Sequence, residues 1–342
     1  MNKIMYVTLW VTTDCNLNCR YCYEGINKTN KIININTIDK SIEFIMNYFN
    51  FQDIIEFNLN IHGGEPFLAF DEIKYLVYRF KEVLKNNSIN VLYTTTTNAT
   101  LFNDEIIEFI VNEIPDITIS LDGTKSTHDK MRPFKNGKGS YDRVKKNSLN
   151  LLKYLPNLRV RMTFDSNTVH NLYEDVKSLI DLGFRFIVAM PNLYDKNWST
   201  EHINILEEQI KCIEEYQSSF DNVFINLTEN KKYFSNGVCN GGKTHFQIYP
   251  DGKIYPCIVS AGNDEFQIGD IYNGIDYKKR DSILEKSYQL NQVCYGCKIY
   301  NYCDGTRCKI INKLITNNYY IPPHMVCALE NLQYKMYATK KI

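Results

Sequence analysis

The sequence has no excess charge of either sign and no long apolar run. Its 342 residues include 39 Lys plus Arg and 39 Asp plus Glu, so the formal net charge is zero. Without a basic excess, the chain lacks the general electrostatic attraction to phosphates on which nucleic-acid binding depends. No stretch approaches the ~18 apolar residues of a membrane-spanning helix, and no small-residue cleavage site follows the N-terminal residues. We therefore expect a cytoplasmic protein with no nucleic-acid or membrane partner.

Cysteine is the informative residue type, with eleven copies that are not evenly spread. Three lie near the N-terminus (Cys15, Cys19 and Cys22), seven lie between Cys239 and Cys327, and Cys212 stands alone. Because cytosolic thiols stay reduced, clustered cysteines in such a chain indicate metal binding more than disulfide bonds.

The first 190 residues alternate between strand patterns and helix patterns. The expected strands are Ile4–Val11, Ile54–Ile61, Ile89–Thr97, Asp116–Leu121, Leu158–Phe164 and Phe184–Met190. Between them, apolar residues recur at helical spacing, as in Ile38, Ile42, Ile45 and Phe49. The expected helix ends are N-caps at Asn36, Asp71, Asn103 and Ser140 and a glycine after the C-cap at Gly183.

Six strand–helix units in succession predict an α/β fold with a parallel sheet and right-handed crossovers, closed or partly closed into a barrel of six units. In such a barrel the chemistry lies at the carboxyl ends of the strands. The series ends with a helix at about Thr200–Phe220. Short strands then follow at Phe246–Tyr249, Lys253–Ile258 and Gln267–Ile271, with little periodicity beyond them. We expect a domain boundary near 221–236, giving domains 1–220 and 221–342.

The N-terminal cysteines directly follow the first expected strand. Three thiolates on one short loop can bind three corners of a 4Fe–4S cluster and leave its fourth iron open to a small molecule. A structural zinc site would need a fourth Cys or His nearby. A zinc loop or plain buried thiols are the alternatives.

The spacing Cys15-x3-Cys19-x2-Cys22 at the end of a first strand resembles that of the radical S-adenosylmethionine (SAM) superfamily. Further matches end the next strands in order: His62-Gly63-Gly64-Glu65-Pro66, Thr97-Asn98-Ala99-Thr100 and Ser120-Leu121-Asp122-Gly123, with Arg161 on the fifth strand. The resemblance implies a partial (β/α)6 TIM-like barrel.

The same resemblance assigns roles to individual residues. Cys15, Cys19 and Cys22 would ligate the catalytic cluster. The SAM molecule would be held by Tyr21, through backbone contact near the adenine, by Gly63, Gly64 and Glu65 at the amino group, by Asn98 at the ribose, and by Ser120 and Arg161 at the carboxylate. Asp14 and Glu24 flank the cluster loop and are weak candidates for a catalytic role, because either can simply cap the loop.

The C-terminal cysteines resemble the seven-cysteine SPASM (or twitch) domain of radical SAM peptide and protein maturases. Cys239-x12-Gly252-x4-Cys257 is followed by Cys294-x2-Cys297-x5-Cys303-x4-Cys308 and, after eighteen residues, Cys327. That family usually has x3 where this chain has x4 before Cys308. A zinc ribbon is the alternative for the whole set.

The SPASM resemblance implies two auxiliary 4Fe–4S clusters, and thus three clusters in all. Cys239, Cys257 and Cys308 would bind auxiliary cluster I, and Cys294, Cys297, Cys303 and Cys327 would bind auxiliary cluster II. Cluster I then lacks a fourth protein ligand. Cys212 could supply it, but an open iron that binds a substrate thiolate is the preferred interpretation.

SPASM domains accompany the modification of peptides and proteins, so the expected substrate is a ribosomally made peptide. The preferred hypothesis is a maturase that forms thioether crosslinks from cysteine. A maturase that forms carbon–carbon or aromatic crosslinks is the alternative. An anaerobic sulfatase-maturating enzyme is disfavoured, because those enzymes place an Asp after the second SPASM cysteine and Ile258 follows Cys257 here. A non-catalytic iron–sulfur protein is disfavoured by the intact SAM motifs.

The expected partners are the precursor peptide and an external electron donor of the flavodoxin or ferredoxin type. Because the first strand begins at about Ile4, no leader-binding module is expected before it. Leader recognition would then use a separate protein, the barrel rim or the C-terminal region.

Overall fold

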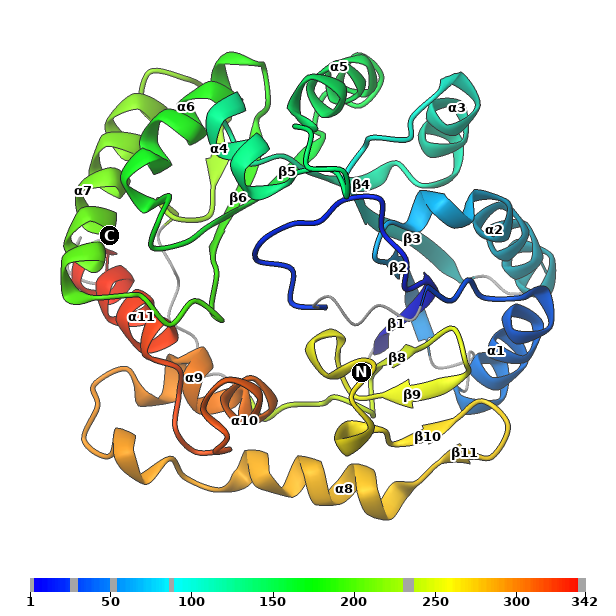
Figure 1. Cartoon of the computed structure of the whole chain (residues 1–342). Coiled ribbons are helices and arrows are strands. Elements are labelled where there is room, and N and C mark those ends of the chain that lie inside the picture. Colours follow the sequence, from blue (N-terminus) through cyan, green and yellow to red (C-terminus); the bar gives the residue numbers. More distant parts are fainter. Residues whose placement is uncertain (1–2, 25–29, 50–53, 86–88, 230–236, 338–342) are drawn as a thin grey trace. The chain divides into compact units, whose positions relative to one another are not determined.

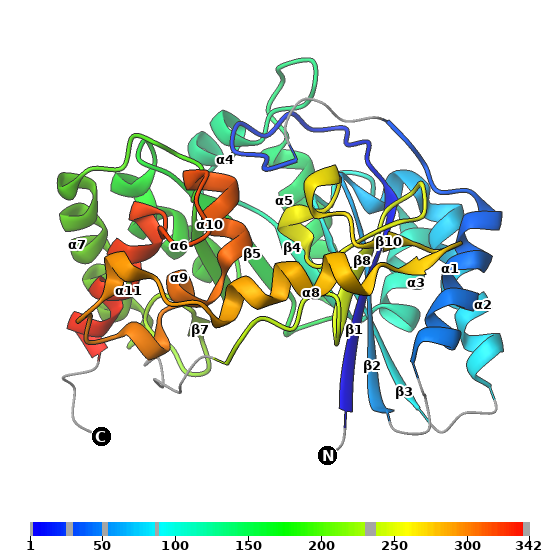
Figure 2. The same ribbon diagram turned by 90° about the horizontal axis from the view of Figure 1, so that it is seen from below.

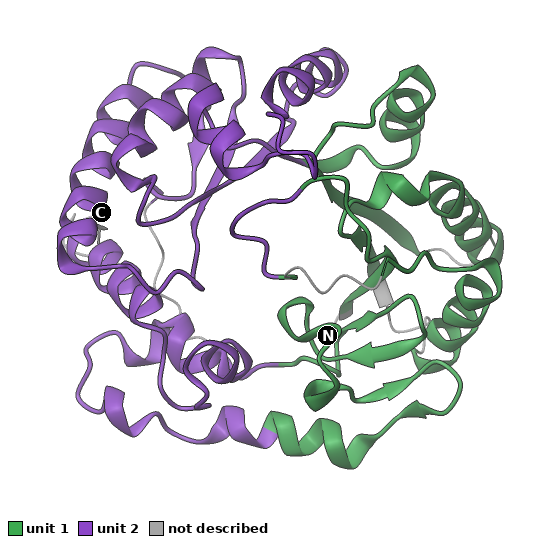
Figure 3. Ribbon diagram, in the orientation of Figure 1, with its two compact units in different colours: residues 1–17, 24–118, 240–284 green, residues 18–23, 119–239, 285–342 purple. Residues whose placement is uncertain are grey.

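The computed structural model describes residues 3–24, 30–49, 54–85, 89–229 and 237–337. The chain forms two compact units that interleave along the sequence (Figure 3). Unit one comprises residues 1–17, 24–118 and 240–284, and unit two comprises residues 18–23, 119–239 and 285–342. Part of the expected boundary region, 230–236, lies outside the described residues, and the division into 1–220 and 221–342 stays a prediction.

Unit one is built on a sheet whose first strands are parallel. Its strands are β1 (Lys3–Thr12), β2 (Ile54–Gly63), β3 (Asn90–Thr97), β8 (His245–Ile248), β9 (Lys253–Tyr255), β10 (Gly269–Asp270) and β11 (Gly274–Ile275). The strands β1, β2 and β3 run side by side in one direction (Figure 2). β8 joins the free edge of β1 in parallel, with Val7 opposite Phe246. The sequence predicted the strands β1, β2 and β3 to within a few residues.

Three helices of unit one cover one face of these strands (Figure 1). They are α1 (Ile35–Tyr48), α2 (Phe70–Leu84) and α3 (Asp104–Glu113), with a short 3-10 helix η2 (Pro66–Ala69) before α2. Ile38, Ile42 and Ile45 of α1 are buried as their helical spacing predicts. The rings of Phe49 and Phe246 stack with centroids 5.5 Å apart, and this contact ties α1 to β8.

A chain of antiparallel strands continues the sheet beyond β8. The turn Pro250-Asp251-Gly252 joins β8 to β9, and Gly252 adopts a φ of +83° that favours glycine. The predicted strand Lys253–Ile258 is shorter in the structure: it ends at Tyr255, and 3-10 helix η4 (Ile258–Ser260) begins three residues later. Strand β10 pairs with β9 and β11 but is shorter than the predicted Gln267–Ile271. The 3-10 helix η5 (Asp264–Phe266) lies just before it.

Unit two contains three parallel strands and most of the remaining helices. Its strands are β5 (Arg159–Phe164), β6 (Phe186–Pro191) and β7 (Phe224–Ile225), while β4 (Asp116–Ser120) begins in unit one and ends in unit two. Its helices are α4 (Lys125–Met131), α5 (Tyr141–Leu152), η3 (Val169–Asn171), α6 (Leu172–Asp181) and α7 (Thr200–Gln217), followed by the C-terminal set described below. The Gln209 side chain of α7 accepts a 2.8 Å hydrogen bond from Tyr173 N–H and so links α7 to α6.

Two of the predicted helix caps are wrong. Asn34, not Asn36, caps α1: its side chain accepts the N–H of Thr37 at 2.8 Å, which places Asn36 inside the first turn. Asp71 also lies inside a helix, because η2 precedes α2 and Ala69 occupies the cap position. The predictions at Asn103, Ser140 and Gly183 are confirmed, although the Ser140 hydroxyl donates to Arg132 O instead of capping α5.

The C-terminal segment contains more helix than its weak periodicity predicted. Its helical elements are α8 (Tyr277–Glu285), η6 (Lys286–Tyr288), η7 (Gln292–Cys294), η8 (Tyr300–Tyr302), α9 (Asp304–Arg307), α10 (Lys309–Thr316) and α11 (His324–Tyr337). The pattern was obscured because α10 and α11 bury polar residues such as Asn312 and Glu330 beside apolar ones. No helix in the described part of the chain combines the length and apolarity needed to cross a bilayer.

Candidate iron–sulfur and SAM site

The N-terminal cysteine loop begins directly after β1 and divides between the two units. Cys15 is buried in unit one, whereas Cys19 and Cys22 are half-buried in unit two, where Cys22 N–H donates to Cys19 O at 3.2 Å. The Asp14 carboxylate accepts a 2.7 Å hydrogen bond from Cys15 N–H, and Asp14 N–H donates to the Thr12 hydroxyl at 3.0 Å. These contacts show Asp14 capping the start of the loop. Glu24 lies at the far end of the loop, next to the residues outside the described ranges.

The glycines after β2 permit a close approach to this loop. A Cβ atom on Gly64 would lie 2.4 Å from Asp14 O and 3.0 Å from Cys15 Cβ, and a Cβ on Gly63 would lie 2.7 Å from Thr12 O. Glu65 N–H donates to Asp14 O at 2.8 Å across the same gap. Because only glycine fits between these backbones, the end of β2 packs directly on the start of the cysteine loop.

The Glu65 carboxylate is buried and holds the ends of two strands together. It accepts hydrogen bonds from the Thr97 hydroxyl at 2.6 Å, from Asn98 N–H at 2.7 Å and from Phe67 N–H at 3.2 Å. Burial raises the pKa of Glu65 to about 7, although these three donors act in the opposite direction. Three of the four lone pairs of the carboxylate are used internally, which leaves room for one more donor.

Asn98 joins this group from the end of β3. Its side-chain amide donates to Asn16 Oδ1 at 2.9 Å and lies 3.9 Å from Cys15 Sγ, and its carbonyl accepts from Thr100. Unit one therefore brings together four of the predicted site positions: Cys15, Gly64, Glu65 and Asn98. Because the Asn98 amide lies next to the Cys15 thiol, it also borders the space beside that thiol.

The other predicted SAM residues lie in unit two. Ser120 is buried at the end of β4, and the next residue, Leu121, donates its N–H to Arg161 O at 3.1 Å. Ser120 and Arg161, the two residues predicted to bind the SAM carboxylate, therefore lie on adjacent backbone segments. The Arg161 side chain is exposed. The Tyr21 side chain donates its hydroxyl proton to Asp122. The SAM contacts of Tyr21, Ser120 and Arg161 stay predictions.

Sequence reasoning missed two residues next to the cysteine loop, Asp122 and Arg132. Asp122 is fully buried, and its Oδ2 accepts the Nε–H of Arg132 at 2.9 Å. The signal was available, because Asp122 belongs to the quoted Ser120–Gly123 motif and a carboxylate directly after a buried strand needs a partner. The partner lies ten residues further on, after α4, and no spacing rule connects the two.

Within unit two, the four cysteines predicted to bind auxiliary cluster II lie near one another. Burial, and then the charges of Cys327 and Cys297, raise the pKa of Cys294. Burial raises the pKa of Cys303 to about 11, with a smaller contribution from Cys327. Cys294, Cys297 and Cys327 interact pairwise and Cys303 interacts with Cys327, a donor set that suits an iron–sulfur cluster. Among the described residues, no three such side chains already stand in metal-coordinating geometry.

The cysteines predicted to bind auxiliary cluster I do not share one unit. Cys257 lies in unit one, where its sulfur is 3.4 Å from the Ser260 hydroxyl, whereas Cys239 and Cys308 lie in unit two. Their grouping stays a prediction. Cys212 is exposed on α7.

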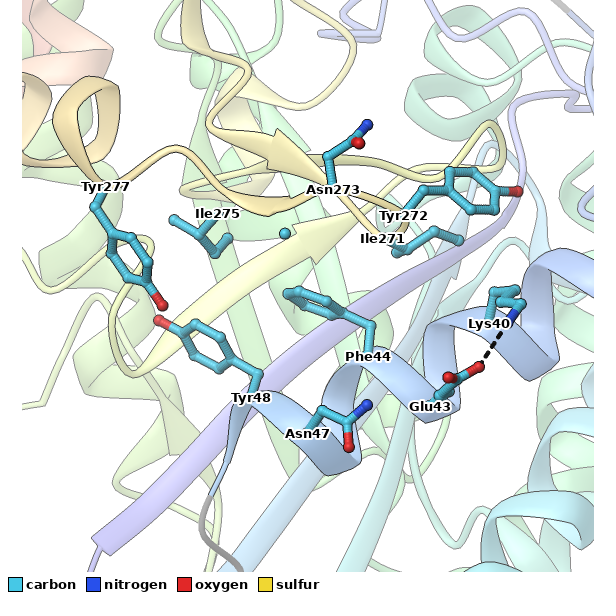
Figure 4. A pocket seen from close by; sticks show the side chains of 11 residues that line it. Lys40, Glu43, Phe44, Asn47, Tyr48, Ile271, Tyr272, Asn273, Ile275 and Tyr277 are labelled. Atoms are coloured by element: carbon cyan, nitrogen blue, oxygen red, sulfur yellow. Dashed lines mark hydrogen bonds and ion pairs between the residues drawn. The ribbon is translucent and has the colours of Figure 1, made fainter.

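A surface groove of about 460 Å³ lies elsewhere in unit one (Figure 4). It runs between α1 and the β10–β11 hairpin, and aromatic side chains from both sides, including Phe44, Tyr48, Tyr272 and Tyr277, line it. None of the predicted cluster or SAM residues lines this groove.

Two family models match separate parts of the chain. Residues 5–144 match a 4Fe-4S single cluster domain, and residues 239–298 match SPASM, an iron–sulfur cluster-binding domain. An uncharacterized protein of Methanocaldococcus jannaschii is 30% identical over 246 residues, which is 66% of this chain and 83% of that protein. A cysteine-type anaerobic sulfatase-maturating enzyme of Clostridium novyi is 26% identical over 323 residues, 85% of this chain and 84% of that enzyme.

Solved structures confirm the predicted fold class. The structure of anSMEcpe with bound AdoMet superposes with a TM-score of 0.81 at 18% identity, covering 98% of this chain and 93% of that one. The structure of Streptococcus suis SuiB bound to its precursor peptide SuiA gives a TM-score of 0.66 at 18% identity, covering 96% of this chain and 76% of that one. The fold is therefore α/β, with a parallel sheet of the partial TIM-barrel type and a C-terminal SPASM domain.

Proposed function

Because the chain belongs to the radical SAM enzymes that carry a SPASM domain, we propose that it forms cysteine thioether crosslinks in a ribosomally made peptide. The observation that carries this proposal is the composition of the C-terminal cysteine set. Four of these cysteines interact within unit two and would complete one cluster, whereas the other three would leave one iron of a second cluster without a protein ligand. A substrate thiolate is a fitting fourth ligand for that iron.

The proposal assigns the N-terminal site to Cys15, Cys19 and Cys22, which would hold a 4Fe–4S cluster with SAM on its open iron. Cluster and SAM together supply, when bound, a carbon-centred radical that removes a hydrogen atom from the substrate. Gly63 and Gly64 keep the backbone of the β2 end close to the loop.

Five residues would contact SAM itself. The free lone pair of Glu65 would accept from the SAM ammonium, and Asn98 would face the ribose side. Ser120 and Arg161 would hold the carboxylate, and the Tyr21 backbone would face the adenine. The chain's own task is to bind, to orient and to exclude other hydrogen donors.

The auxiliary ligands would lie in a C-terminal domain, 221–342, after a barrel domain of 1–220. Cys239, Cys257 and Cys308 would bind auxiliary cluster I, and Cys294, Cys297, Cys303 and Cys327 would bind auxiliary cluster II. An external flavodoxin- or ferredoxin-like protein would supply electrons, and a separate protein could present the leader of the precursor peptide.

Sulfatase maturation is disfavoured although three relatives carry that name. The position after Cys257 is Ile258, whose aliphatic side chain cannot accept a proton. The residue before Cys257, Pro256, carries no carboxylate either. Carbon–carbon crosslinking needs no thiolate ligand and is the competing outcome of the experiment below.

The test is anaerobic co-expression of the enzyme with a short cysteine-containing peptide encoded beside its gene, followed by mass spectrometry. We expect the loss of two hydrogen atoms per link, and the linked cysteine should no longer react with an alkylating reagent. Cys212→Ala serves as the matched control, because this exposed cysteine lies outside all proposed ligand sets. Linked peptides whose thiols still alkylate would instead favour carbon–carbon bonds, and conversion of a cysteine to an aldehyde would restore the sulfatase-maturase alternative.

A further inference from the structure

The second half of the cysteine loop is bound to one short segment of unit two. Asn18 N–H donates to Pro133 O at 2.8 Å, and Arg20 N–H donates to Met131 O at 2.9 Å. These two backbone bonds bracket Cys19 and set the register of the loop against the end of α4. The loop is thus held from outside the cysteine motif itself.

Tyr21 lies between Cys19 and Cys22 in the sequence, and its side chain connects the loop to Asp122. Its hydroxyl donates to Asp122 Oδ2, which also accepts the Nε–H of Arg132 at 2.9 Å. The guanidinium carbon of Arg132 lies 5.1 Å from the centroid of the Tyr21 ring. The other oxygen of Asp122 accepts Thr163 N–H at 3.0 Å, so the carboxylate is fixed on both sides. We call Tyr21, Asp122 and Arg132 the loop clamp.

A network of further hydrogen bonds supports the loop clamp. Asp122 N–H donates to His128 Nδ1 at 3.2 Å, His128 Nε2 lies 3.0 Å from the Ser140 hydroxyl, and that hydroxyl donates to Arg132 O at 2.6 Å. Burial lowers the pKa of His128 to about 4, so the ring is neutral. Because the Nδ1 atom of His128 accepts a hydrogen bond, its Nε2 atom carries the proton. Every polar group of this network then has a partner.

The loop clamp also places a permanent positive charge near a cluster ligand. Arg132 is buried, and the charge of Cys19 is among the interactions that stabilise its cationic form, together with Asp122 and Tyr21. An arginine stays charged at any relevant pH, and a charge in a buried site is poorly screened by water and salt.

We propose that the loop clamp positions the Cys19–Cys22 half of the loop and that the Arg132 charge makes the cluster held there easier to reduce. Reduction adds a negative charge to that cluster, and cluster potentials respond to nearby charges and hydrogen bonds. The side chains of Tyr21, Asp122 and Arg132 act here as positioning groups. The inference rests on the proposed function only in assigning a cluster to these cysteines.

The test is an anaerobic redox titration of the reconstituted full chain, with dithionite as reductant and without SAM or peptide. The EPR signal that is missing from the Cys22→Ala protein identifies the N-terminal cluster. Arg132→Met should make its one-electron reduction about tenfold less favourable, a shift of about 59 mV to more negative potential. Arg132→Lys, which keeps the charge, should stay close to wild type. Arg143→Met is the matched control, because Arg143 also stacks on an aromatic ring, Phe134, but is exposed and lies outside the loop clamp.

Arg132→Met leaves Asp122 without its cation, so the double variant Asp122→Asn with Arg132→Met guards against misfolding. Because this double variant removes one charge of each sign, it should show a smaller negative shift than Arg132→Met alone. Tyr21→Phe removes only the hydroxyl and should lower the iron bound at the N-terminal site while the auxiliary signals stay intact. An unchanged potential in Arg132→Met, a double-variant shift as large as that of Arg132→Met, or equal shifts in Arg132→Met and Arg132→Lys overturns the charge argument. Full iron content with an unaltered N-terminal signal in Tyr21→Phe overturns the positioning argument.

A failure of the proposed function looks different. A protein that forms the clusters but makes no linked peptide leaves this inference untouched, because the titration needs neither SAM nor peptide. A protein that takes up zinc in place of iron at Cys15, Cys19 and Cys22 contradicts both.

Discussion

The carboxylate of Glu65 accepts a 2.7 Å hydrogen bond from the backbone N–H of Asn98, and this bond ties the end of β2 to the end of β3. The same side chain receives the Thr97 hydroxyl on its other oxygen. One buried carboxylate therefore organises two of the strand ends at which a barrel of this type places its chemistry. Its protonation state matters to both stability and binding.

Glu65 should make the stability of the cluster-free protein depend on pH. Burial raises its pKa from 4.5 to about 7 in the folded chain. A folded-state pKa above the unfolded value means that the folded protein holds the proton more tightly. The contribution is therefore fully present below about pH 4.5 and is lost as the pH rises through about 7. Over that window the wild type should lose roughly 3 kcal/mol from this group.

Denaturant unfolding of wild type and Glu65→Gln at pH 5, 6, 7 and 8 measures the effect. The difference in unfolding free energy, wild type minus variant, should fall steadily as the pH rises, because glutamine does not titrate. Other buried carboxyls such as Asp175, with a pKa of about 6, cancel in this difference. A difference that is flat, or that grows with pH, would show that Glu65 is ionised in the folded chain throughout.

The N-terminus of α1 offers a direct comparison between the cap that the structure shows and the cap that the sequence suggested. Asn34 accepts the Thr37 N–H at 2.8 Å and the Thr37 hydroxyl at 3.1 Å. Asn34→Ala should lower the free energy of unfolding by about 1 kcal/mol. Asn36→Ala should change it by less than about 0.5 kcal/mol, since this exposed residue caps nothing. Thermal and denaturant unfolding of both variants decides the matter, and equal losses would contradict the observed cap.

Strand and helix positions in the first 220 residues could be predicted because burial there follows simple periods. Leu9, Phe57 and Ile119 lie on strands whose alternation of apolar and polar residues is visible in the sequence. The helical spacing of the apolar residues of α1 is equally clear. Cap positions failed where a polar residue occurs twice within three positions, as at Asn34 and Asn36, because only the path of the incoming chain chooses between them.

The site was predictable where a motif follows one strand end and unpredictable where partners come from distant elements. The glycines at 63 and 64 and the carboxylate of Glu65 lie where their order along the chain suggests. The pairing of Asp122 with Arg132 depends on how α4 returns to the end of β4, which the sequence alone does not specify. The C-terminal helices escaped prediction because buried polar residues and cysteines replace the usual apolar stripe.

Cys303 provides a test of the auxiliary ligand set within unit two. It is buried, and its pKa of about 11 means that the thiol is protonated at neutral pH until a metal displaces the proton. Cys303→Ala should reduce the iron content of the reconstituted protein by about four atoms from roughly twelve, the total of three 4Fe–4S clusters. Iron analysis and EPR should show the N-terminal signal unchanged. The exposed Cys212→Ala control should keep its full iron content, and an equal iron content in both variants would remove Cys303 from the ligand set.

Gly64 should be among the least replaceable residues of unit one. A methyl group at this position would lie 2.4 Å from Asp14 O and 2.8 Å from Asp14 C, and both atoms belong to the backbone that carries Cys15. Neither can move without displacing the cysteine, so Gly64→Ala should prevent the N-terminal cluster from forming while leaving the auxiliary signals intact. Gly237→Ala is the matched control, because nothing lies within 4 Å of the position that its methyl group would take and its backbone conformation is ordinary. Anaerobic reconstitution with iron analysis, and SAM cleavage under dithionite, should separate the two variants: we expect about four irons fewer and no cleavage for Gly64→Ala. Normal SAM cleavage by Gly64→Ala would mean that the β2 end can retreat from the loop without harm, and the close approach would then have no part in holding the site.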